Sequence, residues 1–171
     1  MTFSAATVLD EVKAGTPLAR IAHAHSMDEI FNAVMDGKQG MRYGVSSLDD
    51  AGLRRVAGIE PWSVAMVVGH ALRADEDAHT IARSLALGRV PREGALRYGE
   101  PGESAMGRDA LLAAIAASEA RLAETRVLAA GGPTFAHKDL GELDARGWVL
   151  FIGLHDALHL HQAAAIVRTP R

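Results

Sequence analysis

Four long segments with helix start and stop signals constrain the fold of this chain more than any other feature. Proline stands at the expected first helical position of two of them, as Pro17 and Pro61, and Ser104 can cap another. The segments cover residues 17–37, 60–88, 104–131 and 143–168. Helices of these lengths are roughly 30 to 40 Å long at 1.5 Å per residue, which is typical of a four-helix bundle.

The connection between the second and third segments, residues 88–103, is long enough to decide the topology. It is rich in glycine, proline and charged residues, which predicts a surface loop. About 15 extended residues reach roughly 50 Å, so this loop can run the whole length of a bundle. We therefore expect an all-α four-helix bundle in up-down-down-up order, with the second and third helices parallel.

Shorter segments complete the predicted fold. A short N-terminal helix is expected from Ser4, which can cap it, to near Gly15. Residues 47–58 predict one or two helical turns, whereas residues 37–47 and 131–142 predict loops. The length of 171 residues indicates a single domain over residues 1–171.

Composition agrees with helices and excludes several functions. Half of the chain is hydrophobic (49%) and few residues are aromatic (5%), with alanine and leucine dominant, which favours helices over strands. The net charge is -3 and the sequence has no basic stripe, so nothing in its charge pattern indicates nucleic-acid binding. No apolar run reaches the ~18 residues of a membrane span, and the N-terminus does not resemble a signal peptide. Cysteine is absent, which excludes disulfides and thiolate metal sites, and we expect a cytoplasmic protein.

Histidines on two of the predicted helices suggest a metal site. His155 and His159 are four residues apart, so they share a helix face that points into the bundle, while His161 points elsewhere. His70 lies on the inward face of the second helix. Three ring nitrogens that converge on one cation, with a fourth position open, are typical of a catalytic site. Such neutral nitrogen ligands suit zinc, nickel, iron or copper. The alternative is that each histidine is an ordinary hydrogen-bonded core residue.

Other polar residues are candidates for supporting roles. Gln162 is expected to orient a histidine ring. Asp77 lies on the same face as His70 and is a candidate second-shell group or general base, although its charged neighbours also fit a solvated face. Glu29 is a further candidate base, and His25 is a spare candidate ligand. The remaining histidines are expected on the surface or in loops: His23, His79, His137 and His161.

The sequence HDALH also invites comparison with the zinc-protease pattern His-Glu-x-x-His. Asp156 stands in place of the glutamate, and Ala165 stands where the longer version of the pattern has a third histidine. We therefore do not expect a peptidase.

Two stretches of this sequence resemble the DinB/YfiT-like superfamily of metalloenzymes. The first is EPWSVAMVVGHALRADE, and the second is LGELDARGWVLFIGLHDALHLHQ. The resemblance covers residues 47–168. It implies an up-down-down-up bundle, often dimeric, with His70, His155 and His159 as ligands of zinc, nickel or another divalent ion. The chain departs from the family at Gly147, where relatives often have an acidic residue, and at Leu158, where many have arginine; the N-terminal fifteen residues look like an addition.

Members of this family include enzymes that use low-molecular-weight thiols, such as mycothiol or bacillithiol transferases. The resemblance therefore implies a metal-dependent thiol S-transferase in detoxification or stress, with a small-molecule thiol and an electrophile as partners and a homodimer as the assembly. Because the chain has no cysteine, the thiol must arrive as a cosubstrate. Two alternatives remain open: a hydrolase that uses metal-bound water, and a non-catalytic metal-binding stress protein.

Overall fold

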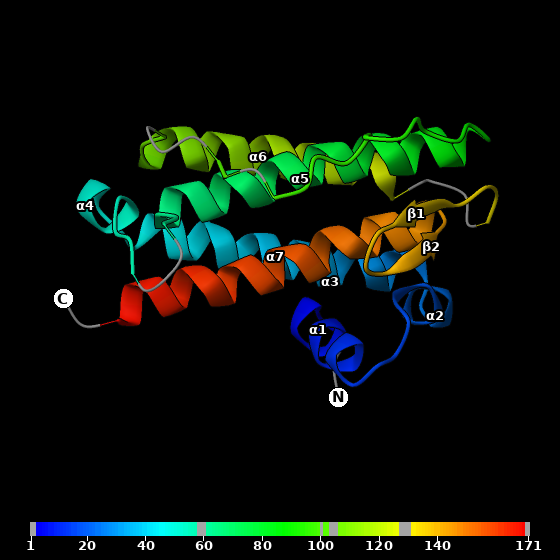
Figure 1. Cartoon of the computed structure of the whole chain (residues 1–171), viewed down its shortest axis with the longest axis horizontal. Helices are drawn as coiled ribbons and strands as arrows, with labels where there is room; N and C mark the ends of the chain where they lie inside the picture. The colour runs from blue at the N-terminus through cyan, green and yellow to red at the C-terminus, as the bar shows by residue number, and fades with distance from the viewer. Residues whose placement is uncertain (1–2, 58–60, 100, 103–105, 127–130, 170–171) are drawn as a thin grey trace.

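Four long helices lie side by side along the length of the molecule (Figure 1). The structure is a computed structural model, and it describes residues 3–57, 61–99, 101–102, 106–126 and 131–169. The long helices are α3 (Met27–Ser46), α5 (Val64–Ala86), α6 (Arg108–Thr125) and α7 (Ala145–Arg168). The shorter elements are α1 (Ala5–Lys13), α2 (Leu18–Ala24), α4 (Asp50–Leu53), β1 (Phe135–His137) and β2 (Gly141–Leu143). The architecture confirms the predicted all-α bundle.

Contacts between helix pairs fix the direction of each helix. Between α5 and α6, His79 contacts the carbonyl of Arg121 and Arg83 pairs with Glu124, so these two helices are parallel. Between α3 and α6 the pairing runs the other way, because Asp28 meets Arg126 at one end of the bundle and Arg42 meets Glu119 further along. Helix α7 is parallel to α3, because Gly153 lies against Val34 and Leu160 lies against Gly40. These directions give the predicted up-down-down-up order.

The long connection between α5 and α6 runs back along α5 as predicted. Its Arg97 binds Asp77 in the middle of α5, and the backbone N–H of Gly102 donates to the carbonyl of Met66 near the start of that helix, at 2.9 Å. Figure 1 shows the described parts of this connection beside α5. The loop therefore returns the chain to the end of the bundle at which α6 begins.

The first predicted long helix is wrong in its boundaries. The segment 17–37 is broken after Ala24, and α3 starts at Met27, where Ser26 and Glu29 form a capping box. That helix continues to Ser46, through the residues 37–47 that the sequence predicted as a loop.

Close packing of α3 against α7 explains why this glycine-containing segment is helical. A side chain at Gly40 would come within 3.0 Å of the Leu160 side chain, and one at Gly37 would come within 3.6 Å of Asp156. Each glycine costs a helix about 1 kcal/mol in propensity, but here glycine lets the two helix backbones approach. Tertiary packing therefore overrides the local signal that predicted a loop.

The other predicted boundaries differ by a few residues. Helix α5 starts at Val64 with Ser63 as its N-cap, three residues after Pro61. Ser104 lies outside the described residues, and the N-cap of α6 is Gly107. The predicted short helix after Ser4 and the helical turn within 47–58 are confirmed.

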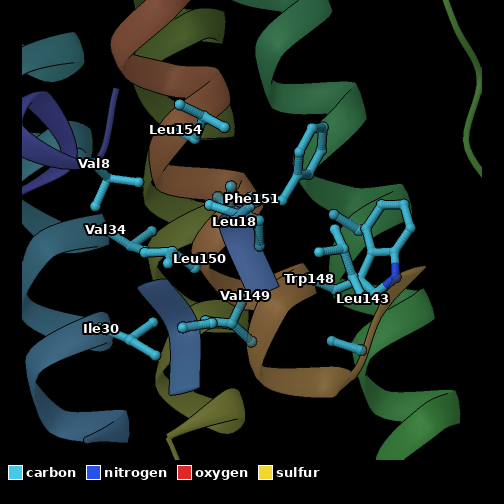
Figure 2. Close-up of a cluster of buried hydrophobic side chains, with 14 of the residues drawn as sticks. Val8, Leu18, Ile30, Val34, Leu143, Trp148, Val149, Leu150, Phe151 and Leu154 are labelled. Atoms are coloured by element: carbon cyan, nitrogen blue, oxygen red, sulfur yellow. The ribbon is translucent and has the colours of Figure 1, made fainter. Parts of the chain in front are cut away.

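A small hairpin replaces the loop predicted at 131–142. Strands β1 and β2 are antiparallel, with Phe135 opposite Leu143. The indole N–H of Trp148 donates to the carbonyl of Phe135 at 3.1 Å, which ties the hairpin to the first turn of α7. Figure 2 shows Trp148 and Leu143 close together, with Phe151 between α7 and α5.

The core consists of two hydrophobic clusters with a polar layer between them. Along α5 one cluster extends to Leu72 and the other starts at Ala74. Along α7 the boundary between the two clusters falls between Ala157 and Ala163. On α3 this boundary falls between Val34 and Met41. The candidate site lies in this middle layer. Among the described residues, no helix is both long and apolar enough to span a membrane.

Candidate metal centre

The three predicted histidine ligands come together in the polar layer. His70 projects from α5 and is buried, and His155 and His159 project from successive turns of α7 and are partly buried. One nitrogen of each ring lies within 4.8 Å of the others. The ring centroid of His70 is 5.1 Å from that of His155 and 4.7 Å from that of His159. The spacing argument therefore placed the rings correctly, although their residues are far apart in the chain.

A hydrogen bond that His159 donates to Gln162 sets the orientation of one ring. The side-chain oxygen of Gln162 lies 2.7 Å from Nδ1 of His159, as the sequence suggested. An amide oxygen only accepts, so Nδ1 carries the proton and Nε2 presents a lone pair. That Nε2 faces Nε2 of His155 at 3.1 Å. Such a second partner commonly orients a metal-bound imidazole.

The arrangement fits a divalent cation. Two ring nitrogens that each lie 2.0 to 2.1 Å from one ion are about 3.4 Å apart in a tetrahedral site, close to the separation between His155 and His159. Burial, together with the charges of His159 and His70, lowers the pKa of His155 well below its ordinary value. This ring therefore stays neutral at neutral pH, which is the form that binds metals.

Asp77 does not contact the histidines directly. Its carboxylate accepts two hydrogen bonds from the guanidinium of Arg97, at 2.9 and 2.7 Å, and one from the backbone N–H of the same residue at 3.1 Å. Asp77 thus holds Arg97 beside the site, and the supporting role suggested for it remains a prediction.

The two other candidates from the N-terminal part lie elsewhere. Glu29 belongs to the capping box at the start of α3. The ring of His25 stacks on Phe3, with 3.6 Å between ring centroids, and its carbonyl accepts a hydrogen bond from Arg146. Since Arg146 precedes His155 by more than two helical turns, neither residue reaches the triad.

Two histidines expected on the surface or in loops are buried. His79 is 5% exposed and its Nε2 lies 2.7 Å from the carbonyl of Arg121. His137 is 7% exposed and lies in β1, where burial lowers its pKa. Both predictions were wrong because helix packing and the hairpin cover these positions. His23 and His161 are exposed, as expected.

Sequence reasoning missed a second polar cluster in the same layer. Lys38 of α3 pairs with Asp75 of α5 and, at 2.8 Å, with Asp156 of α7. Ser118 of α6 donates to Asp75 at 3.2 Å, so all four long helices take part. We call Lys38, Asp75 and Asp156 the buried ion trio. Its signal in the sequence was Lys38 at helical spacing from apolar Val34 and Met41, which the loop prediction concealed.

The electrostatics of the buried ion trio follow from its burial. Burial raises the pKa of Asp156 to about 7, and the neighbouring Asp75 carboxylate acts in the same direction, against Lys38. Burial alone would lower the pKa of Lys38, but Asp156 and Asp75 outweigh it and raise that pKa. The ammonium of Lys38 is therefore charged. Because Asp156 faces Lys38, it does not act as the base of a protease-like His-x-x-x-His motif.

Cavities reach the histidine triad from different sides. His70 and His155 line one of about 340 Å³, bounded by α1, the crossover and the hairpin. His159 lines another of about 280 Å³, between the C-terminal half of α7 and helices α3 and α5. A third, more open cavity lies beside Trp62 and is lined by His70 and His159. A small molecule can therefore approach the triad. This access favours a binding site over the alternative of three ordinary hydrogen-bonded core histidines.

Comparison with known proteins agrees with this geometry. No curated protein and no solved structure matches the chain. The sequence model of the DinB superfamily matches residues 37–163, a range that contains His70, His155, His159 and Gln162. Because this range covers well over half of the sequence, the chain belongs to the DinB superfamily.

Proposed function

We propose that this protein is a metal-dependent thiol S-transferase that joins a low-molecular-weight thiol to an electrophile. The observation that carries the proposal is the convergence of three histidine nitrogens beside cavities of small-molecule size. His70, His155 and His159 would hold a divalent ion, with zinc or nickel as the expected metals. When bound, such an ion lowers the pKa of a coordinating thiol so that its sulfur is nucleophilic at neutral pH.

The chain's own residues prepare the site for this chemistry. Gln162 fixes the ring of His159, and the low pKa of His155 keeps that ring unprotonated. The rings of Trp62 and Phe151 each lie 5.1 Å from a histidine ring of the triad and give the site apolar walls. In the transfer, the S–H bond of the thiol and the bond from carbon to the leaving group break, an S–C bond forms, and the leaving group departs with the thiol proton.

The absence of cysteine supports an external nucleophile, since the protein has no thiol of its own. The hydrolase alternative has less support. It needs a carboxylate base at the triad, but Asp77 binds Arg97 and Glu29 caps α3. A non-catalytic metal-binding protein would share the triad but would not consume thiol.

The proposal includes a homodimer, and light scattering can test it by measuring the molar mass of the protein in solution.

Elemental analysis of the purified protein tests the metal site. Wild type should hold about one equivalent of a divalent transition metal, and His159→Ala should lose it. His161→Ala is the matched control, because His161 is an exposed histidine on the same helix and should retain the metal. Full retention by His159→Ala would remove the proposal.

Thiol consumption tests the reaction. Metal-loaded wild type and His161→Ala should speed the loss of free thiol in the presence of an electrophile, while His159→Ala should not. Bound metal without thiol consumption, over a panel of thiols and electrophiles, would favour the non-catalytic alternative.

A further inference from the structure

The cavity of about 340 Å³ beside His70 and His155 has walls from several parts of the chain. Leu9 and Val12 of α1 form one wall. Leu96, Arg97 and Tyr98 come from the crossover, His137 and Leu140 from the hairpin, and Phe151, Leu154 and Leu158 from α7. Most of these side chains are apolar, and the volume is within the range of small-molecule pockets.

A row of rings leads through this cavity to the triad. The ring centroid of Tyr98 is 5.3 Å from that of His137, which is 4.9 Å from that of Phe151. Phe151 is in turn 5.1 Å from His155. These separations are typical of aromatic contacts, so a planar aromatic molecule can add to the row beside the triad.

The charged groups of the cavity are already paired. Asp77 binds the guanidinium of Arg97. The ammonium of Lys138 lies 4.6 Å from the ring centroid of Tyr98 and 3.9 Å from the carboxylate of Asp139. These charged groups lie at the exposed edge of the cavity, and the inner lining is mainly apolar. A charged group in contact with that apolar lining would lose its hydration, which is costly. The cavity therefore suits an uncharged occupant.

The wall made by α1 lies outside the part of the chain that the superfamily model matches. The superfamily match starts at residue 37, whereas α1 covers Ala5–Lys13. Leu9 is 4% exposed and Val12 is partly buried, and α1 packs against α7. The residues that limit the cavity on this side are thus supplied by the N-terminal segment.

We propose that this cavity binds a small, uncharged aromatic electrophile, and that Leu9 and Val12 limit its size. The identity of the occupant as the electrophile rests on the proposed function. Binding of the aromatic body itself needs only the cavity, so it can be measured without thiol or turnover.

Calorimetric titration with 1,3-dinitrobenzene tests the proposal, because this molecule is uncharged, aromatic and lacks a leaving group. The metal-loaded wild type should bind it, and Val12→Trp, which fills the cavity, should weaken binding at least tenfold with unchanged metal content. Glu11→Trp is the matched control: it adds the same ring at an exposed neighbouring position and should bind like wild type.

A second variant keeps the test decisive if Val12→Trp does not fold. Val12→Ala enlarges the cavity and should bind 1,3-dinitronaphthalene at least threefold more tightly than wild type does. Equal affinity of wild type and both Val12 variants would overturn the proposal. So would chemical-shift changes at Met41 and Leu160, in the cavity on the other side of the triad, in place of changes at Leu9 and Leu154.

The outcome is separable from that of the proposed function. Binding that depends on Val12 in a protein that consumes no thiol would refute the transferase and leave the aromatic site in place. Thiol transfer to an aromatic electrophile at the same rate in Val12→Trp and wild type would refute the site and leave the transferase.

Discussion

The histidine triad and the buried ion trio share one layer of the bundle but differ in their access to solvent. His155 and Asp156 are neighbours on α7, yet the first faces cavities and the second faces Lys38. The members of the ion trio are at most 2% exposed, and the positive charge of Lys38 is paired with the two carboxyl groups. The triad brings together three groups of one kind, none of which neutralises another. Two polar clusters in the same layer can therefore have different roles, and access to a cavity distinguishes the candidate binding site.

Removal of the central charge of the ion trio should have the largest effect. Lys38→Met leaves the Asp75 and Asp156 carboxylates buried without a cation, so the free energy of unfolding should fall by about 3 to 5 kcal/mol. Urea denaturation measures this loss. Metal content of the folded fraction should not change, since the triad residues are untouched.

A triple variant provides the control for this prediction. Lys38→Met combined with Asp75→Leu and Asp156→Leu removes all three charges and should recover most of the lost stability. A triple variant as unstable as the single one would mean that the trio acts through packing rather than charge.

Loss of the Gln162 side chain should affect the triad and leave stability nearly unchanged. Gln162→Ala removes the acceptor that orients His159, so metal affinity should fall about 10- to 100-fold. Competition with a chromogenic chelator measures the affinity. Gln162→Glu keeps an acceptor oxygen and should bind metal nearly as well as wild type; an unchanged affinity in Gln162→Ala would show that His159 needs no orienting partner.

The smallest effect is expected at His79, a buried histidine whose ring nitrogen already has a protein partner. Burial lowers its pKa, with the charges of Arg83 and Arg121 acting in the same direction and Glu124 and the Arg121 carbonyl opposing them. The stability that neutral His79 contributes is present above its unfolded pKa of about 6.5 and is lost as the pH falls through the lower folded value.

His79→Gln keeps a donor for the Arg121 carbonyl and does not titrate. Between pH 6.5 and 5 its unfolding free energy should fall less steeply than that of wild type, by at most about 1.4 kcal/mol per pH unit, the limit for one proton. Urea unfolding at several pH values measures both slopes. Identical slopes would contradict a neutral His79 in the folded protein, and metal content should be the same in both.

The parts of the fold and site that follow from helical periodicity could be predicted from the sequence. A four-residue spacing fixes the common direction of His155 and His159, and the length of residues 88–103 fixes the parallel pair of helices. The ion trio could not be predicted in this way, because the glycines near Lys38 indicate a loop until their packing against α7 is known. Burial of His79 and His137, and the contribution of α1 to a cavity, depend on tertiary contacts that no local pattern encodes.

The adjacency of α3 and α7 has a consequence for how the chain folds. The first and last helices of the bundle are direct neighbours, and Lys38 finds its second carboxylate only when Asp156 arrives. Such pairing of distant segments raises the contact order, which slows folding relative to bundles whose helices pair in sequence. During synthesis Lys38 therefore stays solvated until α7 has left the ribosome. The polar layer of the bundle can be desolvated only after that.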